Sequence, residues 1–575
     1  MKKYWKILKK HKWSLLLSPV LVLIAVVCET VQPFFMARIV DEGVMQSNLS
    51  VITQTGTYMI LVSVAGLLFT LVNVYISSKT AIGFGTDLRN TLFDKIQQLS
   101  FTDIDRFSTA SLITRLTNDI TRIQQIILMC MRILLRAPLL LIMAVFFVIR
   151  INSDLALVLL AAIPVLSIAI FLILRKGFPF FLKVQQKVDQ LNEVVRENLI
   201  NMRVVKSFVR EDFEIKKFGR SNEELRDMVI KASNIVIAMF PVMQLVMNVT
   251  IVAILWIGGS QVISGDLKVG ELISFVNYVM QVLMALMMLS MIIMNFARAS
   301  ASSNRILEVL TADSSLTNTA EGSLNKNRIK RGDIVFKDVC FRYNGGETDV
   351  LKDLNFHIEP GQTVAIVGAT GSAKSTMVQL IPRLYDTTKG EILIDGIPVK
   401  DYNLDELHAN IGMVLQKNEL FTGTIAENLR WGKQNATIDE LIEAAKAAEA
   451  HEFITTFTDG YDTMLGRGGI NVSGGQKQRI CIARALLRKP KILILDDSTS
   501  AVDTETELKI RNNLSRLLKN TTVFIVTQRI NTMQSASKVI VLEDGEINAM
   551  GTPAELMETS DMYKEIYNSQ QIVWE

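Results

Sequence analysis

The chain has 575 residues, of which 49% are hydrophobic and 21% are charged, and its formal net charge is +4. This length exceeds one compact domain, and the share of apolar residues is too high for a wholly soluble enzyme. The net charge is small and spread over a long chain, so it argues for no nucleic-acid partner. Four scattered cysteines lack metal-ligand or disulfide-framework spacing, and we expect them to be reduced packing residues.

Residues 1–13 hold six lysines and two tryptophans, which predicts an amphipathic elbow helix lying along the cytoplasmic face of a membrane. Residues 14–300 are expected to form an all-α transmembrane domain. A membrane-spanning helix needs about 20 mostly apolar residues. Six stretches qualify, near residues 15–37, 58–77, 126–149, 155–174, 235–262 and 272–296.

Basic residues set the orientation, because cytoplasmic segments carry an excess of Lys and Arg. The long segments 79–122 and 175–231 are rich in both, whereas the short loops carry few. An even number of spans returns the chain to the cytoplasm, so we expect a multi-pass cell-membrane protein with a cytoplasmic C-terminal half. The two long segments have helical periodicity and predict paired rods that project beyond the membrane, with tips near 106–112 and 201–208.

Several residues inside the spans are candidate substrate contacts. Glu29, with Gln32, lies in the first span, where an ionisable group is costly and usually functional. Glu29 could attract lipophilic cations or hydrogen-bond to a neighbouring helix. Arg132 and Arg136 lie near the cytoplasmic end of the third span and are expected to snorkel or pair there. Methionines offer varied apolar ligands an adaptable surface, but membrane helices also use them as packing. The candidate methionines of the last two spans are Met243, Met247, Met280, Met284, Met287, Met288, Met291 and Met294.

Residues 301–332, where Ser, Asn, Thr and Lys replace apolar blocks, are expected to link the membrane part to an α/β domain at 333–575. Residues 366–376 read as a buried strand, a Gly-containing loop and a helix start, the order that a phosphate cradle requires. Lys374 would neutralise phosphates and Ser375 would coordinate Mg²⁺. The candidate nucleotide contacts of this loop are Gly368, Gly371, Ser372, Ala373, Lys374, Ser375 and Thr376.

Two further motifs follow this loop. Residues 471–479 contain a Ser-Gly-Gly-Gln turn that opens a helix, which can direct backbone N–H groups and a hydroxyl onto a phosphate. Residues 492–496 read as a continuous apolar strand that ends in Asp496, a carboxylate suited to hold Mg²⁺ beside the phosphates.

Together these motifs resemble those of ABC-type ATPases, and the resemblance covers almost the whole chain. It is nearest to bacterial heterodimeric multidrug ABC exporters. The resemblance implies a six-helix membrane domain followed by an α/β P-loop ATPase domain, with ATP and Mg²⁺ as ligands. It also implies that Tyr343 stacks on adenine, that Gln416 reaches Mg²⁺ and that Asp503 lies at the interface of two ATPase domains. The signature residues Ser473, Gly475 and Gln476 would close over ATP held by a second half-transporter subunit.

Three positions depart from the family's pattern. Ala373 stands where the phosphate loop has glycine, and a positive φ there would cost about 1–2 kcal/mol. Asp497 replaces the glutamate that polarises the attacking water, and a misplacement of about 1 Å can cost on the order of a hundredfold in rate. Gln528 replaces a histidine, and an amide cannot carry its proton. We therefore expect a hydrolytically weakened site in this chain, and a signature loop that completes the partner's active site.

The resemblance implies an ATP-driven exporter of lipophilic or cationic drugs that works among membrane lipids. One alternative keeps the exporter fold but moves a lipid or a peptide. Another is a regulatory membrane subunit that senses ATP without transport. The intact signature loop argues against the regulatory subunit, because that loop serves hydrolysis.

Overall fold

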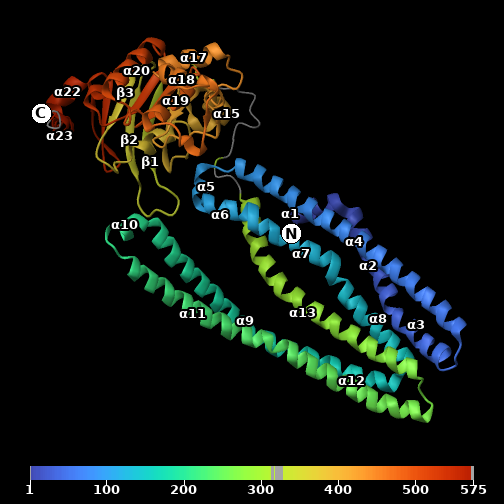
Figure 1. Cartoon of the computed structure of the whole chain (residues 1–575). Coiled ribbons are helices and arrows are strands. Elements are labelled where there is room, and N and C mark those ends of the chain that lie inside the picture. Colours follow the sequence, from blue (N-terminus) through green and yellow to red (C-terminus); the bar gives the residue numbers. More distant parts are fainter. Residues whose placement is uncertain (1, 313–315, 317–327, 572–575) are drawn as a thin grey trace. The chain divides into compact units, whose positions relative to one another are not determined.

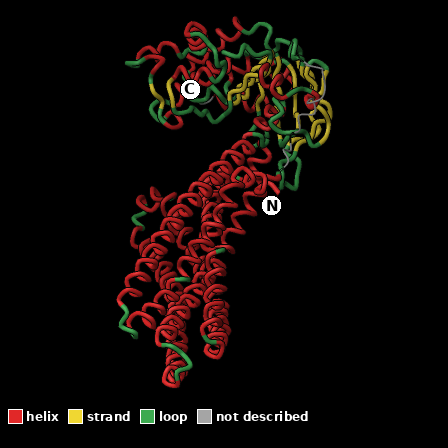
Figure 2. The backbone as a smooth tube through the Cα atoms, turned by 90° about the vertical axis from the view of Figure 1, so that its right-hand side faces the viewer, coloured by secondary structure: helices red, strands yellow, loops and turns green. Residues whose placement is uncertain are grey.

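The computed structural model describes residues 2–312, 316 and 328–571, which belong to two compact units. One unit comprises the chain up to Ile96 together with Ala110–Ala312. The other comprises Gln97–Thr109 together with the chain after Ala312. Among the described residues, strands occur only in the second unit, and the first consists of helices joined by short turns and loops (Figure 2).

The first unit contains six segments that are long and apolar enough to cross a membrane, as predicted. They cover Tyr4–Val44, Leu49–Gln97, Thr109–Ile151, Ser153–Ile200, Glu211–Ser264 and Val269–Leu289. Their α-helices, with the neighbouring helices of this half of the chain, are α1 (Lys2–Leu8), α2 (Lys12–Thr30), α3 (Gln32–Arg38), α4 (Leu49–Gln97), α5 (Phe101–Phe107), α6 (Thr109–Thr114), α7 (Ile120–Met129), α8 (Arg136–Ile151), α9 (Ser153–Ile200), α10 (Met202–Ser207), α11 (Glu211–Ile237), α12 (Met239–Ser264) and α13 (Val269–Thr311). Short 3-10 or π-helical turns join several of them: η1 (Lys9–His11), η2 (Ile39–Val44), η3 (Arg115–Asp119) and η4 (Cys130–Leu134).

The predicted extensions beyond the membrane are helical. α9 and α11 lie side by side and are closed by α10, which coincides with the predicted tip at 201–208 (Figure 1). The predicted tip at 106–112 is not one helix, because Ser108 has a φ of +55° and separates α5 from α6. α5 belongs to the second unit, although the sequence around it belongs to the membrane half.

The predicted linker at 301–332 needs a correction at its start. α13 continues to Thr311, because Ile306, Val309 and Leu310 follow helical spacing and are buried. Residues 313–315 and 317–327 of that prediction lie outside the described residues.

The second unit is built on a six-stranded sheet with the order β12-β11-β3-β10-β9-β6, in which every pairing except β11 with β12 is parallel. A four-stranded antiparallel sheet, β2-β1-β4-β5, and the pair β7-β8 complete it. The strands are β1 (Ile334–Phe341), β2 (Leu351–Ile358), β3 (Thr363–Val367), β4 (Lys389–Ile394), β5 (Ile397–Pro398), β6 (Ile411–Val414), β7 (Gly423–Thr424), β8 (Met464–Leu465), β9 (Ile492–Asp496), β10 (Thr522–Val526), β11 (Lys538–Glu543) and β12 (Glu546–Gly551).

Helices cover this sheet, so β9 and β10 are buried along their whole length and read as continuous apolar runs. The helices are α14 (Lys374–Leu380), α15 (Leu404–Asn410), α16 (Ile425–Arg430), α17 (Ile438–Ala447), α18 (His451–Thr456), α19 (Gly474–Leu486), α20 (Thr504–Leu517), α21 (Ile530–Gln534), α22 (Pro553–Thr559) and α23 (Asp561–Gln571). The carboxyl ends of parallel strands meet at one edge of a sheet, which is where such folds bind ligands.

Candidate active site

The phosphate loop connects β3 to α14. Gly368 has a φ of +149°, and a Cβ there would come within 2.2 Å of the Leu542 carbonyl oxygen, so this position requires glycine. Ala373 precedes α14 with a φ of +70°, a left-handed conformation in which a Cβ is strained. Lys374 Nζ lies within the loop and donates to the carbonyl oxygens of Gly368 (2.9 Å) and Ala369 (2.7 Å).

Two oxygen ligands suited to Mg²⁺ converge beside this loop. Ser375 Oγ, in the first turn of α14, donates to Asp496 Oδ1 at the end of β9, at 2.9 Å. Burial raises the pKa of Asp496, and the charge of Asp497 adds to this effect. A hydroxyl and a carboxylate oxygen form the hard donor set that Mg²⁺ prefers. These residues therefore fit a magnesium ion.

The parallel register brings four separate segments to the same edge. The edge holds the phosphate loop after β3, Gln416 after β6, Asp496 and Asp497 at the end of β9, and Gln528 after β10. Sequence motifs separated by up to about 160 residues thus face one ligand site.

Asp497 is held firmly at this edge. Its φ is +48°, its backbone N–H donates to Val526 O at 3.1 Å, and its backbone carbonyl oxygen accepts from Ser500 Oγ at 3.0 Å. Burial raises the pKa of this carboxyl group, although the nearby Ser500 hydroxyl and the charges of Arg529 and Lys374 oppose the shift. Gln528, by contrast, is exposed. Asp497 and Gln528, two of the three positions that depart from the family's pattern, therefore lie at the same edge as the phosphate loop, which holds the third, Ala373.

Tyr343 belongs to a cluster of aromatic rings beside α14. Its ring centroid lies 4.8 Å from that of Phe341 and 5.4 Å from that of Tyr385, and its hydroxyl lies 3.0 Å from Thr376 Oγ1. The ring is half-buried next to the phosphate loop, a position suited to an aromatic platform for a base.

Sequence reasoning missed Tyr385, which connects this cluster to α5. Its ring lies 6.2 Å from that of Phe101, and its hydroxyl donates to Asp105 Oδ2 at 2.8 Å. Burial and the neighbouring Asp105 carboxylate raise the pKa of Tyr385 above its ordinary range. A tyrosine that closely follows the phosphate-loop helix has no spacing rule of its own, so no sequence signal identified it.

Ser473 is the N-cap of α19. Its Oγ accepts from Gln476 N at 3.3 Å, and Gln476 Oε1 accepts from Ser473 N at 2.9 Å, which completes a capping box. The Ser473 hydroxyl proton can still be donated to a ligand. At Gly475, a Cβ would lie 2.7 Å from the carbonyl oxygen of Ala501, so any larger residue clashes within this chain.

The segment from Ser500 to Asp503 is fixed by residues that the sequence did not reveal. Gln478 Oε1 accepts from Ala501 N at 3.0 Å. Arg529 donates to the carbonyl oxygens of Ser500 (3.0 Å) and Val502 (2.7 Å) and pairs with the buried Glu507. The N-cap of α20, Asp503, accepts from the Thr506 N–H at 2.9 Å. One segment therefore connects the signature helix to the strand end that carries Gln528.

In the membrane unit, Glu29 is paired with Arg136. Arg136 Nη2 donates to Glu29 Oε2 at 2.7 Å, so the interhelical interpretation of Glu29 holds, and the carboxylate is not an isolated negative charge. Gln32 Nε2 donates to the carbonyl oxygens of Cys28 and Met59, both at 3.3 Å. All four cysteines are free, as predicted.

The candidate methionines separate into two groups. Met243 is buried in the core between α8, α9, α12 and α13, and Met247 and Met287 pack against it, so these three serve packing. Met280 and Met284 are exposed, Met284 to 63%. The side chains of Met291 and Met294 lie outside the described ones.

In comparisons with known proteins, both halves of the chain match families of ABC transporters. The family described as "ABC transporter transmembrane region" matches residues 15–286, and that described as "ABC transporter" matches residues 351–500. A solved structure described as a bacterial Atm1-family ABC exporter with ATP bound has the same fold, with a TM-score of 0.82 at 24% identity over 98% of each chain.

Relatives match over nearly the full length. A Bacillus subtilis protein named "Uncharacterized ABC transporter ATP-binding protein YfiB" is 41% identical over 99% of this chain and 98% of its own. The "Putative multidrug export ATP-binding/permease protein YgaD" of the same organism is 31% identical over 100% and 99% of the two chains. An "ATP-dependent lipid A-core flippase" of Syntrophus aciditrophicus is 33% identical over 84% and 80%.

Proposed function

The chain belongs to the ABC transporter family and is an exporter subunit with a cytoplasmic transport ATPase domain, and we propose that it is the weakly hydrolysing subunit of a heterodimer. Its own site would hold ATP and turn it over slowly. Its Ser473–Gln476 loop would complete the fully active site of the partner subunit.

The observation that carries this proposal is the pair of side chains at the sheet edge, Asp497 and Gln528. Asp497 is one methylene shorter than glutamate, and its backbone is fixed by the hydrogen bonds to Val526 O (3.1 Å) and from Ser500 Oγ (3.0 Å), so the chain does not compensate for the shorter side chain. Gln528 can donate and accept hydrogen bonds, but it cannot take up a proton. Both changes weaken the activation of an attacking water, and neither weakens the binding of the phosphates.

The ligands of this site are proposed to be ATP and Mg²⁺. Ser375, Gln416 and Asp496 would hold the ion, which when bound would neutralise charge on the phosphates. Tyr343 would stack on adenine, and Asp503 would lie at the interface with the partner. The remaining phosphate contacts would come from Gly368, Gly371, Ser372, Ala373, Lys374 and Thr376.

The transported compounds are proposed to be drugs or other lipophiles. The relatives named as a putative multidrug export protein and as a lipid A-core flippase favour apolar or amphipathic substrates, and the second keeps a lipid as the alternative. The exposed Met280 and Met284 of α13 provide an adaptable apolar surface for such compounds. Attraction of cations by Glu29 loses its basis, because that carboxylate is already paired.

The test compares ATP turnover of two assemblies, the chain alone and the chain with a co-expressed partner half-transporter. We expect little turnover alone. In the heterodimer, Asp497→Asn should leave most of the activity, whereas Ser473→Ala should remove most of it. If Asp497→Asn is as damaging as the equivalent change in the partner, both sites hydrolyse and the proposal is wrong.

Ser473→Ala also deletes a helix cap, which costs about 1 kcal/mol of stability. Thr437→Ala is the matched control, because Thr437 caps α17 with the same capping-box geometry and lies outside the signature loop. Equal losses of activity in both variants would mean that the Ser473 effect is only structural. Gly475→Asp is unsuitable, since any Cβ there meets Ala501 of the same chain.

A further inference from the structure

The six predicted spans contain only three charged residues: Glu29, Arg132 and Arg136. Two positive charges therefore face one negative charge. The ion pair between Glu29 and Arg136 uses the only carboxylate, so the charge of Arg132 has no countercharge within the spans. An ionisable residue inside a membrane span is costly and is a functional candidate.

Arg132 is held in place by neutral groups from α4. Its Nε donates to Ser77 Oγ at 2.8 Å, and its Nη2 donates to Ser78 Oγ at 2.6 Å and to Val74 O at 2.9 Å. These acceptors orient the guanidinium without neutralising it. Its Nη1 has no hydrogen-bond partner among the described residues, so one edge of the guanidinium remains available.

Arg132 lies in an irregular helical turn that a neighbouring helix holds in place. Arg132 lies in η4, a π-helical turn, and such turns are frequent at functional sites. The buried Ser18 of α2 fixes this turn, because its Oγ donates to Met131 O at 3.0 Å and to Asn73 Oδ1 at 2.7 Å. Ser18 therefore connects η4 to both α2 and α4.

Arg136 adds a second incomplete guanidinium four residues later. Its Nη2 donates to Glu29, and its buried Nε has no hydrogen-bond partner among the described residues. Arginine presents N–H groups in a planar fork that matches a carboxylate or a phosphate.

We propose that Arg132, assisted by Arg136, binds the acidic head group, a carboxylate or a phosphate, of an amphipathic substrate within the membrane domain. This inference rests on the proposed export of lipophilic compounds and names their chemical class. The head group would supply the missing countercharge, and its apolar part would remain among the membrane helices. Export of an acidic amphiphile then replaces export of a cation as the expected activity.

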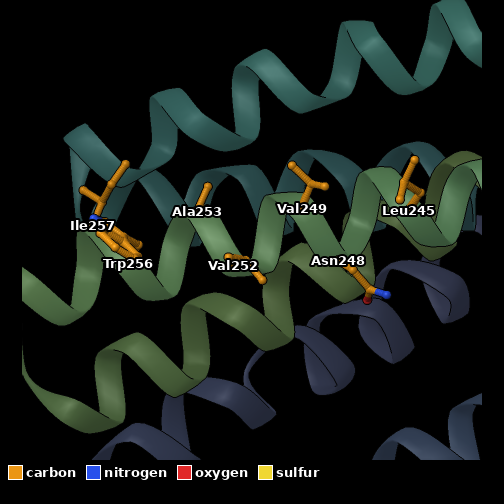
Figure 3. Close-up of a pocket in the computed structure, with 7 residues that line it drawn as sticks. All are labelled: Leu245, Asn248, Val249, Val252, Ala253, Trp256 and Ile257. Carbon is orange, nitrogen blue, oxygen red and sulfur yellow. The ribbon is translucent and has the colours of Figure 1, made fainter.

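A hollow of about 520 Å³ on α12 is another candidate for a substrate contact in this unit, and it does not compete for an anion. Figure 3 shows that its lining residues all come from α12, and among them only Asn248 is polar. It offers no charge and no second wall from another element. We therefore assign the head group to Arg132.

The test uses the full-length chain, in the assembly in which it purifies, in nanodiscs of neutral phosphatidylcholine without ATP. Two matched probe pairs distinguish the sources of the anion. Pyrenebutyrate against pyrenebutanol tests a small lipophilic acid, and fluorescent phosphatidylglycerol against fluorescent phosphatidylcholine tests a lipid. The measured quantity is the ratio of the dissociation constants of the neutral and the acidic probe in each pair.

We expect the natural chain to favour the acidic member of at least one pair by about tenfold or more, as a charged hydrogen bond allows. Arg132→Gln should bring this ratio close to one, and Arg132→Lys should keep part of it. Glu29→Gln should raise the ratio, because it frees Arg136 from its countercharge. Arg150→Gln, an arginine near the outer end of α8 that stacks on Phe146, is the matched control and should change nothing.

The inference is overturned if the natural chain and Arg132→Gln have the same ratio, or if Glu29→Gln lowers it. The Glu29→Gln arm remains decisive if Arg132→Gln fails to fold, because it predicts a gain. Binding is measured without nucleotide, so its outcome is separate from that of export. A heterodimer with the partner subunit that prefers acidic probes but does not move them on addition of ATP would refute the proposed export of lipophilic compounds and not this site.

Discussion

Tyr385 contacts α5, which the chain inserts between the membrane helices α4 and α6, so we predict that this contact couples ATP turnover to the membrane helices. Tyr385→Phe removes one hydroxyl, which donates to Asp105 at 2.8 Å, and keeps the ring contact with Phe101. A hydrogen bond to a charged acceptor contributes about 1.5–3 kcal/mol when buried. Asp105 is exposed, so solvent competes, and we take about 1 kcal/mol. That energy corresponds to about a fivefold shift between docked and undocked α5.

The assay measures ATP turnover in proteoliposomes with and without a transported compound. Basal turnover should stay within about twofold, because Tyr385 touches no residue of the Ser375–Asp496 pair. The increment that the compound adds should fall about fivefold. Asp105→Asn, which keeps an acceptor but loses its charge, should give an intermediate loss.

Tyr461→Phe provides the control, since it deletes a similar half-buried hydroxyl in the same domain, one that contacts His451 Nδ1 at 3.0 Å and not α5. In a double-mutant cycle, Asp105→Ala should cause no further loss once Tyr385 is phenylalanine. Unchanged stimulation in Tyr385→Phe, or an equal loss in Tyr461→Phe, would refute the reasoning.

Four further outcomes are expected. Ala373→Gly should raise the unfolding free energy of the ATPase domain by up to about 1 kcal/mol, because it relieves left-handed strain, although glycine also raises the chain entropy of the unfolded state. Because the strain is present before ATP binds, ATP affinity measured by calorimetry should change only if the Ala373 methyl group touches phosphate. Because burial raises the pKa of Asp496, Mg²⁺-dependent ATP binding should weaken as pH falls, and the loss should begin above the ordinary pKa of an aspartate. Titrations of ATP binding between pH 7.5 and 5 test this. The pH dependence of binding should be weaker in Asp496→Asn. Glu507→Gln should destabilise the domain by about 3 kcal/mol, since it leaves Arg529 without its buried partner, and urea unfolding of the variant should show it. Met287→Ala should lower stability through a core cavity, whereas Met284→Ala should alter the ranking of transported compounds at unchanged melting temperature; the reverse pattern would exchange their roles.

The parts of the site that follow strands could be predicted from sequence. Gly368 and Asp496 end or follow apolar runs, and parallel pairing brings such strand ends together whatever the rest of the chain does. The six membrane spans could also be predicted from sequence, because length and apolarity alone define them.

Contacts between distant segments could not be predicted. Glu29 and Arg136 are 107 residues apart, and neither position reveals the other. The methionines of α13 occupy several sides of one helix, so only packing decides that Met287 is partly buried and Met284 exposed. The π-helical turn at Arg132 adds one residue to a helical turn, a change that apolar periodicity does not report.

The place of α5 in the second unit has a consequence for biosynthesis. Asp105 and Tyr385 are separated by 280 residues, so at about 5–20 residues per second the ribosome delivers the partner of α5 roughly 15 to 55 s later. The membrane helices around α5 are complete before its docking surface exists. Newly made chains must therefore wait with Phe101 uncovered, and a chaperone that binds exposed aromatic side chains has that interval in which to act.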